Sequence, residues 1–384
     1  MTQPPPDGPQ NDQGQNDQGQ SDQGLTDQDQ AVTKVAEEGV DGLARETEGL
    51  SQGQIVRKRF MHNTGAVVSV LVFIAVFILA FTSIGFGPLP GWWDWGYTQT
   101  PPVLNGGRPT LGLSGLGEHP FGQDNLGRDL FAMTMRGTQM TLIVMVMVGV
   151  ITGIMGVVIG AVSGYFRGWI EAVLMRLTDI IIIIPLLVLA AVLGKMAMSY
   201  VGKGVGQVIA LGIMIGLFAW TALARLVRAE ILSLREREFV DAARLAGADD
   251  KRIIFKHILP NSVGVITVNL TLLLAAAVLL ETALSYLGFG VQAPDWSLGR
   301  LISANQQAFA TRPWLFWFPG LFIILICLSI NFIGDGLRDA FDPRQKKFNP
   351  KKAKETSAHM LDETDYARAG ADTDGNAPGP QKPA

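Results

Sequence analysis

Six long apolar runs constrain the fold of this chain more than any other feature of its sequence. The runs cover roughly residues 64–84, 139–164, 170–194, 205–225, 262–284 and 314–334. A run of about 18 or more apolar residues with few charges is long enough to cross a bilayer as a helix, and a helix satisfies its own backbone polar groups there. We therefore predict an all-α polytopic membrane protein with about six transmembrane helices.

The segments outside the runs suggest how the chain is divided. Residues 1–54 are rich in Gln and Asp and begin with an imperfect repeat, so they offer too few large apolar side chains for a packed core. They also lack the apolar segment of a signal peptide. We expect a disordered cytoplasmic tail at 1–54, a first transmembrane helix and extracytoplasmic loop at 55–137, a transmembrane core at 138–336 and a polar cytoplasmic tail at 337–384.

Lysine and arginine are concentrated in some of the segments between the runs. The segment before the first run, the loop 226–260 and the segment after the last run carry most of them. Because basic residues accumulate on the cytoplasmic side of a membrane, we predict that the N-terminus, the C-terminus and the loop 226–260 are cytoplasmic. The loop 85–118 is then extracytoplasmic, and its aromatic residues Trp92, Trp93 and Trp95 are expected at the membrane interface.

Several kinds of chemistry find no support in the sequence. It contains no Gly-x-x-x-x-Gly-Lys-Ser/Thr phosphate-binding loop, and its single cysteine, Cys327, lies inside an apolar run, which excludes a disulfide framework. No residues have metal-ligand spacing, and the runs lack the mid-membrane ionisable residues that carry ions or protons in secondary transporters. We expect a chain that is not an enzyme, binds no metal or other cofactor, and receives its energy from outside the bilayer.

The charged loop 226–260 is rich in helix-forming residues. Apolar side chains at helical spacing predict that the fourth run continues as a helix out of the membrane: Val227, Ile231 and Leu234. We expect this helix to persist through Ala242, Ala243 and Ala246. It should end at Gly247, because glycine readily adopts the left-handed conformation of a helix C-cap.

A second short helix is expected at 251–258, with Asp249 or Asp250 at its N-cap, and Pro260 is expected to end it before the fifth run. Small alanines on such a surface allow a partner to come close, and attachment to two transmembrane helices would transmit any displacement into the membrane. We infer a docking site for a soluble partner that moves this loop. A DNA-binding helix–turn–helix, whose basic residues would suit phosphates, and a plain basic inner loop are alternatives.

Two features of the runs favour close helix packing. Glycines recur at four-residue spacing, at positions 149 and 153 and at positions 156, 160 and 164, which lets helix backbones approach each other in lipid. Pro185 and Pro319 fall inside runs, where neighbouring helices can compensate for the lost hydrogen bond. Both features are also common in polytopic proteins in general.

Three ionisable residues near the ends of the runs are candidates for a structural or gating role. Arg176 and Asp179 are three residues apart, so they share one face of a helix and can pair there. An anchoring role is favoured for this pair over a role in transport. Glu281 lies near the outer end of the fifth run, where a carboxylate is a functional candidate, although its position close to the interface favours a structural role.

The pattern Asp241-Ala242-Ala243, then Gly247, then Ile258-Leu259-Pro260 resembles the EAA loop of ABC importer permeases, with Asp241 where the family usually has Glu. Further stretches are similar to the dipeptide/oligopeptide branch (DppC/OppC type, peptide/nickel) of these binding-protein-dependent inner-membrane components: 119–129, 165–168, 175–179, 281–294 and 334–344. The resemblance covers roughly residues 55–344. It departs from the branch at Gln123, where Thr is common, and in the longer, Trp-rich loop 85–118.

The resemblance implies a type I ABC importer permease fold and a coupling helix within 239–260 that docks into a cleft of an ATPase subunit. The residues that would couple to the ATPase are Asp241, Ala242, Ala243, Gly247, Ile258, Leu259 and Pro260. The implied partners are a second, related permease, two ABC ATPase subunits that hold ATP and Mg, and an extracytoplasmic solute-binding protein. Membrane lipid surrounds the assembly, and nucleic acid plays no part.

The resemblance further implies a subunit of the cytoplasmic membrane that moves di- or oligopeptides by alternating access. Related permeases also carry nickel complexes or other small solutes, so these substrates stay open. Two other hypotheses are a self-contained secondary transporter or channel, with the loop as a regulatory surface, and a membrane-tethered DNA-binding regulator. Co-purification of an ATPase favours the importer, whereas ion-driven flux by the chain alone favours the secondary transporter.

Overall fold

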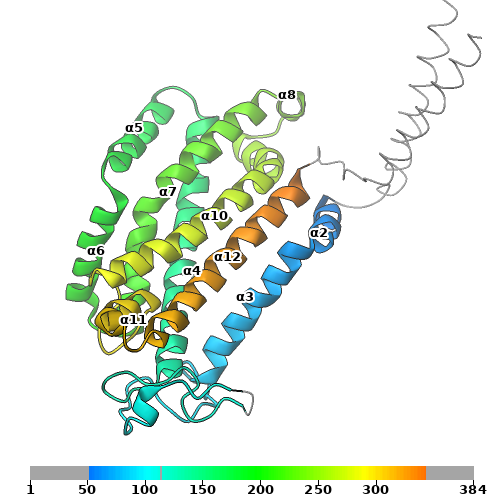
Figure 1. The fold of residues 1–384 in the computed structure, drawn as a ribbon. Helices are drawn as coiled ribbons and strands as arrows, with labels where there is room; N and C mark the ends of the chain where they lie inside the picture. Colours follow the sequence, from blue (N-terminus) through cyan, green and yellow to red (C-terminus); the bar gives the residue numbers. More distant parts are fainter. Residues whose placement is uncertain (1–51, 113–114, 343–384) are drawn as a thin grey trace, which may run out of the picture. The chain divides into compact units, whose positions relative to one another are not determined.

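The computed structural model describes residues 52–112 and 115–342 (Figure 1). The tails predicted from composition lie outside the described residues over 1–51 and 343–384. The chain divides into two units, and the first ends at Thr64. Of that unit the structure describes the helix α2 (Gln52–His62), which begins inside the segment 1–54 and carries the basic residues before the first apolar run.

Helices make up the second unit. In chain order they are α3 (Thr64–Ser83), α4 (Leu130–Tyr165), α5 (Trp169–Ile183), α6 (Leu186–Val201), α7 (Val205–Arg235), α8 (Glu238–Leu245), α9 (Asp250–Arg252), α10 (Leu259–Tyr286), α11 (Leu298–Asn305) and α12 (Trp314–Phe341). Two 3-10 turns, η1 (Asn105–Gly107) and η3 (Gln306–Ala308), lie in loops, and a π-helical turn, η2 (Ile253–Ile258), precedes α10. Within the described ranges, β-structure is limited to isolated bridges, so the predicted all-α class is confirmed.

Five of the described helices are long and apolar enough to cross a membrane: α3, α4, α7, α10 with the turns before it, and α12. A sixth crossing results if α5 and α6 are counted as one bent span, which agrees with the prediction of about six. The prediction of a single span at 170–194 is wrong in one respect, because the chain bends by 86° between α5 and α6. Ile184 is extended there, since a following proline disfavours the helical conformation and Pro185 has no N–H to donate.

Glycines form the contact between the two central helices, α4 and α7. A Cβ atom on Gly160 would lie 2.6 Å from Val227 Cβ, and one on Gly216 would lie 2.8 Å from Ile151 Cβ. The glycines at 156 and 164 also face α7, and those at 149 and 153 face leucines of α10. The predicted role of these glycines is confirmed, because only a residue without a side chain permits so close an approach of two helices.

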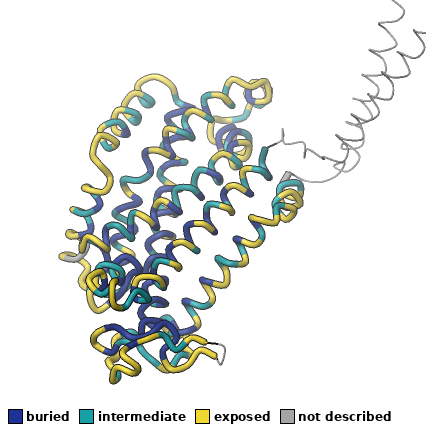
Figure 2. The backbone as a smooth tube through the Cα atoms, viewed as in Figure 1, coloured by how far each residue is buried: buried dark blue, intermediate teal, exposed yellow. Residues whose placement is uncertain are grey.

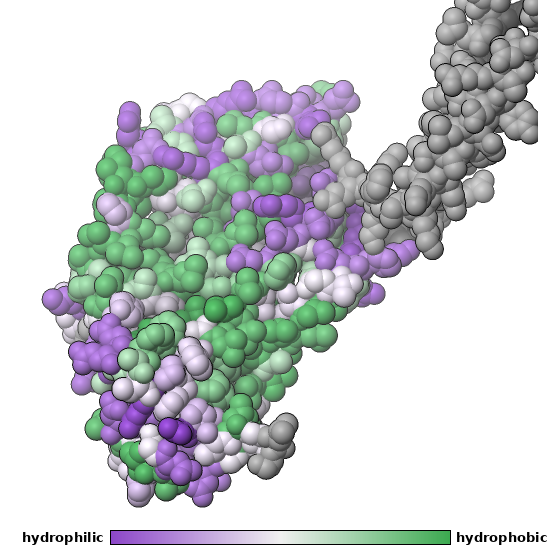
Figure 3. All heavy atoms as spheres, viewed as in Figure 1, coloured by the Kyte–Doolittle hydropathy of each residue, from purple (hydrophilic) through white to green (hydrophobic). Residues whose placement is uncertain are grey.

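The helical bundle of the second unit has two different ends. We call the end that carries α8 and the turns after it the α8 end, and the end that carries α11 and the loop between α3 and α4 the α11 end (Figure 1). On the face shown in Figure 3, hydrophobic residues cover the middle of the bundle and hydrophilic residues gather at both ends. α10 and α12 run between the two ends, and α12 continues through Pro319 to Phe341, beyond the predicted tail boundary at 337.

Burial divides the helices into an inner and an outer group. Figure 2 shows buried residues along α4, α7 and α10 and exposed residues along the outward sides of α3, α5 and α6. Large apolar side chains are among the exposed ones, for example Ile78 on α3 and Ile183 on α5. In a protein that crosses a bilayer, such residues face lipid or another membrane subunit rather than water.

Candidate functional site

The helix α8 is separate from α7, which corrects the expectation of one continuous helix. α7 ends at Arg235, and α8 begins at Glu238 after a short break. The break allows Val240 to turn inward, where it is fully buried in a cluster with Tyr165, Ile231 and Ile253, among others. One apolar side chain thus fastens α8 to the ends of the transmembrane helices, although the helix itself is only eight residues long.

Gly247 ends α8 as predicted. Its φ of +80° is in the left-handed region, which a residue with a Cβ adopts only at a cost. The Gly247 N–H donates to Arg244 O, and the Ala248 N–H donates to Ala243 O. This pair of hydrogen bonds is a Schellman motif, which satisfies the last carbonyls of a helix and reverses the chain direction.

The segment after this turn does not form the separate helix that was expected at 251–258. Asp249 stands at the N-cap, but its side chain makes no capping bond, and α9, η2 and α10 run on as one helical stretch from Asp250 to Tyr286. The expectation that Pro260 ends a helix is therefore wrong. The π-helical turn lies directly before this proline, and its wider backbone accommodates a residue that lacks an N–H.

The structure places the predicted coupling residues in two groups. Asp241, Ala242, Gly247 and Pro260 are exposed, whereas Ala243 and Leu259 are half-buried and Ile258 is fully buried. The exposed residues are free to meet a partner, and the buried ones connect the loop to the bundle. Whether they couple to a partner stays a prediction.

Two apolar side chains that the sequence analysis gave no role stand out at the α8 end. Leu245 is 90% exposed and Phe255 is 67% exposed. A large exposed apolar side chain outside the candidate membrane spans, such as Leu245, indicates a contact site for another protein, whereas Phe255 lies inside the stretch Asp250–Tyr286 that could cross a membrane. Helical periodicity could have identified Leu245, because five residues after Val240 it falls on the opposite side of α8.

Tyr165 is a further residue at this end for which the sequence suggested no role. It ends α4, and its hydroxyl donates to Asp250 Oδ1 at 2.6 Å, while its carbonyl oxygen accepts from Arg235 Nη1 at 2.6 Å. The guanidinium of Arg244 lies 6.0 Å from the centre of its ring. This side chain therefore joins α4, the end of α7, α8 and the start of α9.

Ion pairs join α5 to α7 near the α8 end. Arg228 of α7 donates to Glu171 of α5 through Nε at 2.9 Å, and Arg225 pairs with Asp179. The pair proposed from spacing, Arg176 with Asp179, does not form, because Asp179 faces α7 while Arg176 is exposed. α5 is thus attached to α7 by two charge pairs and follows α7 if that helix moves.

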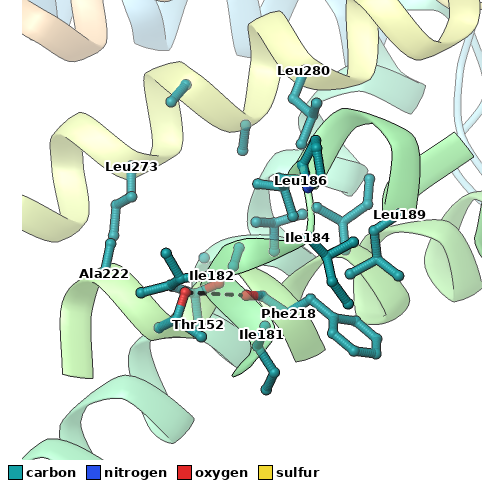
Figure 4. A pocket seen from close by; sticks show the side chains of 18 residues that line it. Thr152, Ile181, Ile182, Ile184, Leu186, Leu189, Phe218, Ala222, Leu273 and Leu280 are labelled. Carbon is teal, nitrogen blue, oxygen red and sulfur yellow. Dashed lines mark hydrogen bonds between the residues drawn. The ribbon is translucent and has the colours of Figure 1, made fainter. Parts of the chain in front are cut away.

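A cavity of about 320 Å³ lies beside the bend between α5 and α6 (Figure 4). Side chains from α4, α5, α6, α7 and α10 line it, among them Thr152, Ile184, Leu186, Phe218 and Leu280. The lining is almost entirely apolar, apart from the hydroxyls of Thr152 and Thr221. The lining therefore presents apolar surface and no charged side chain.

Glu281 is fully buried near the α11 end of α10. The hydroxyl of Thr141 in α4 donates to its Oε2 at 2.8 Å, and the hydroxyl of Ser285 donates to its Oε1 at 2.6 Å. Ser297, at the N-cap of α11, lies beside the carboxyl group. The structure thus brings Glu281 together with three hydroxyls and keeps it away from Arg176 and Asp179, which lie near the α8 end.

The loop between α3 and α4 is held by buried polar groups. Asp129 Oδ1 lies 2.8 Å from His119 Nδ1, and Asp129 Oδ2 accepts from Trp93 Nε1 at 2.9 Å. Burial raises the pKa of the Asp129 carboxyl, and hydrogen bonds from Ala132 N–H, His119 and Trp93 partly offset this rise. Trp93 is therefore part of the core of this loop, and its expected position at the membrane interface stays a prediction.

Gln123, a departure from the pattern of the peptide branch, has a structural explanation. Its side chain is fully buried and accepts from the Leu104 N–H at 2.8 Å. It also donates to the carbonyl oxygens of Pro102 and Gly127 at 3.0 and 2.9 Å. A primary amide, which both donates and accepts, holds the extra length of this loop in a way that a threonine is too short to match.

Across residues 52–112 and 115–342, no group of three or more His, Cys, Asp or Glu side chains could hold a metal ion. The α8 end presents an exposed face to a possible partner, and the cavity beside the bend has a mostly apolar lining.

Comparisons with known proteins agree with this description. Residues 156–347 match the family described as binding-protein-dependent transport system inner membrane component. The chain is 35% identical over 305 residues to the oligopeptide transport system permease protein OppC of Mycobacterium tuberculosis (strain ATCC 25618 / H37Rv), covering 78% of this chain and 97% of the relative. It is 38% identical over 303 residues to the protein of the same name in Escherichia coli (strain K12), covering 78% and 94%. A chain of the inward-facing MetNI methionine ABC transporter aligns with a TM-score of 0.44 and 22% identity, covering 55% of this chain and 96% of that one.

Proposed function

Because the chain belongs to the family of binding-protein-dependent transport system inner membrane components, we propose that it is the permease subunit of an ATP-driven importer of oligopeptides. It is a multi-pass protein of the cytoplasmic membrane and a transport subunit rather than an enzyme. The observation that carries the proposal is the small helix α8, which Val240 fastens to the transmembrane bundle while its outer face stays exposed. The peptide substrate is inferred from the names of the relatives.

The α8 end is proposed to face the cytoplasm. Lys251, Arg252 and Lys256 are exposed there, and no ion-pair partner for them lies among the described residues. They belong to the loop 226–260, which is rich in lysine and arginine. An excess of lysine and arginine in a short loop favours the cytoplasmic side, which supports this orientation.

We propose that an ATPase subunit contacts the exposed side of α8, with ATP and Mg bound by that partner and not by this chain. Leu245 would be the apolar anchor of the contact, with Asp241 and Ala242 beside it. A nucleotide-dependent movement of the partner would shift the permease between states only if the partner binds α8 more tightly in one of them. Tyr165 and Val240 would transmit the displacement to α4 and α7, and the ion pairs would transmit it from α7 to α5.

A second permease subunit is proposed to cover the bend between α5 and α6. The chain loses regular helical hydrogen bonding at Ile184 and Pro185. Irregular backbone at membrane depth is tolerated only where protein covers it or where it lines a water-filled cavity. The cavity beside the bend would then be one half of the pathway, and its counterpart would come from the second subunit.

The apolar lining of the cavity bears on the substrate. A pathway without charged groups makes no strong ionic contact with a peptide, so side-chain identity would have little influence on passage. Specificity would then rest on a separate extracytoplasmic solute-binding protein, the partner implied by the name of the family. Nickel complexes or other small solutes are the alternative, and competition for uptake separates them from peptides.

The proposal is tested by uptake of labelled tri- and pentapeptides in cells that carry a deletion of this chain. We expect uptake to return with the wild-type chain and with Gly247→Asn, because asparagine tolerates the left-handed conformation. Gly247→Pro should insert normally and fail to restore uptake, since proline holds φ near −65°. Normal uptake with Gly247→Pro, uptake after loss of the companion ATPase, or flux driven by an ion gradient would each reject the proposal.

A further inference from the structure

Glu281 is a buried acidic residue that the coupling route described above does not use. It is fully buried, its described hydrogen-bond partners are the hydroxyls of Thr141 and Ser285, and the uncharged Ser297 lies beside it. Burying a carboxyl group is costly unless donors satisfy it. A well-packed apolar residue would give at least as much stability at such a position. We therefore look for the reason for an acidic residue in the arrangement of helices that its carboxyl group needs around it.

The hydroxyls around Glu281 come from three separate segments. Thr141 belongs to α4, Ser285 lies one turn further along α10, and Ser297 caps α11, where its Oγ accepts from the Arg300 N–H at 3.3 Å. Ser285 Oγ also accepts from the Val291 N–H at 3.1 Å, which ties down the loop between α10 and α11. The carboxyl group is therefore the meeting point of α4, α10 and α11.

The backbones around this point are packed closely. A Cβ atom on Gly299 of α11 would lie 2.1 Å from the Thr282 carbonyl oxygen of α10, and one on Gly137 of α4 would lie 3.0 Å from the Leu298 nitrogen. A hydrogen bond weakens steeply as its atoms separate or its angle closes. If α4, α10 and α11 spread apart, Glu281 would lose donors inside a site that offers no replacement.

We propose that Glu281 is a positioning residue that holds α4, α10 and α11 as one rigid block at the α11 end while the α8 end is displaced. The idea rests on the proposed importer function, in which force enters at α8. If the three helices do not separate at the α11 end, a displacement that starts at α8 moves the helices around the bend between α5 and α6 instead, where the cavity lies. Without the carboxyl group the same force would open the α11 end, and ATP hydrolysis would proceed without transport.

The first test measures the block directly and does not depend on transport. Val291 is 1% exposed, so a cysteine at this position reports opening of the α11 end through its reaction with a membrane-impermeant maleimide. Cys327, the single native cysteine, is replaced by serine in every variant. In the full chain in vesicles we expect Glu281→Ala to raise the labelling rate at least tenfold, and Glu281→Gln to keep it within about threefold because an amide can exchange hydrogen bonds with the same hydroxyls.

Two further variants complete the labelling test. Thr141→Val removes one donor with little change in shape, so it keeps the test valid if Glu281→Ala does not fold, and an intermediate rate is expected. Leu279→Ala, exposed on the same helix, is the matched control and should label as slowly as the parent. Equal labelling of Glu281→Ala or Thr141→Val and the parent would overturn the proposal, whatever the transport activity of the chain.

The second test separates positioning from general stability. In the assembled complex, ATP hydrolysis is measured with and without loaded binding protein, per assembled complex. We expect Glu281→Ala to lower the ratio of stimulated to basal rate by at least tenfold, and Glu281→Gln to restore most of it. Equal loss of both rates would indicate a merely structural role and overturn the proposal. Absence of any ATP-dependent uptake by the parent would instead reject the importer function and leave the labelling result intact.

Discussion

Replacing Val240 by alanine is expected to loosen α8 from the bundle without disturbing the transmembrane helices. The substitution removes two methyl groups from a side chain that is fully buried between α8, α4 and the turns before α10. At about 0.8 kcal/mol per buried methylene-sized group, with a further contribution from the cavity left behind, the docked state of α8 loses about 2 kcal/mol. Since 1.4 kcal/mol corresponds to a factor of ten, the ratio of docked to undocked α8 should fall by about 30-fold.

Hydrogen exchange of the backbone amides in α8 measures this ratio. In the purified chain without its partners, amides of Val240→Ala within Glu238–Leu245 should exchange about 30-fold faster than in the parent, while amides in the middle of α4 and α7 should not change. The matched control is Leu245→Ala, on the same helix but 90% exposed. It should leave exchange in the isolated chain unchanged and weaken only the contact with the ATPase.

The result that refutes this reasoning is specific. If Val240→Ala leaves α8 protected as in the parent, Val240 does not fasten the helix and the buried cluster carries no mechanical role. If Leu245→Ala speeds exchange as much as Val240→Ala does, the two faces of α8 are not distinct, and the assignment of one to the bundle and the other to a partner is wrong.

Three further predictions concern the connections between helices. Tyr165→Phe removes the hydroxyl that donates to Asp250, which should lower the local stability of this contact by about 1–2 kcal/mol. Amides at 249–253 should then exchange faster, and exchange at the rate of the parent would contradict the prediction. Gly160→Leu must push α7 away from α4, because even a Cβ would lie 2.6 Å from Val227 Cβ. We expect the free energy of unfolding, measured by thermal unfolding, to fall by about 3 kcal/mol. Gly320→Ala should be neutral, because its added Cβ meets no atom within 4 Å. Arg228→Gln breaks the charge pair with Glu171 and should lower uptake per ATP hydrolysed without changing insertion, while Arg176→Gln, at an exposed position, should match the parent.

Hydropathy predicted α3 and α12 well because a bilayer leaves an apolar run few alternatives to a helix. It did not predict the bend between α5 and α6. Pro185 and Pro319 look alike in the sequence, yet α12 continues through Pro319 and the chain turns by 86° at Pro185. Whether a proline bends a helix depends on the neighbours that replace the lost hydrogen bonds, and those neighbours are distant in the chain.

Local spacing had the same limit at the candidate site. It predicted the turn at Gly247, because the left-handed conformation depends on that one residue. It also suggested that Asp179 pairs with Arg176. The partner is instead Arg225 on another helix, and spacing within one helix gives no information about contacts with another helix. The break before α8 was not predicted, because helix-forming residues continue across it. The break is required by the burial of Val240 and is not marked by a turn residue.

The π-helical turn at Ile253–Ile258 has a consequence for how this region tolerates insertions and deletions. A π-turn is an α-helix that has accepted one additional residue. Because the wider turn absorbs the additional residue locally, deleting a single residue there would let the chain relax into a regular helix while the segment before it keeps nearly the same direction relative to α10. The contact of Ile253 with Val240 should therefore survive such a deletion. Related chains that differ in length by one residue at this turn should present the surface beyond it in the same direction, and exchanging these loops between them should preserve coupling in the hybrids.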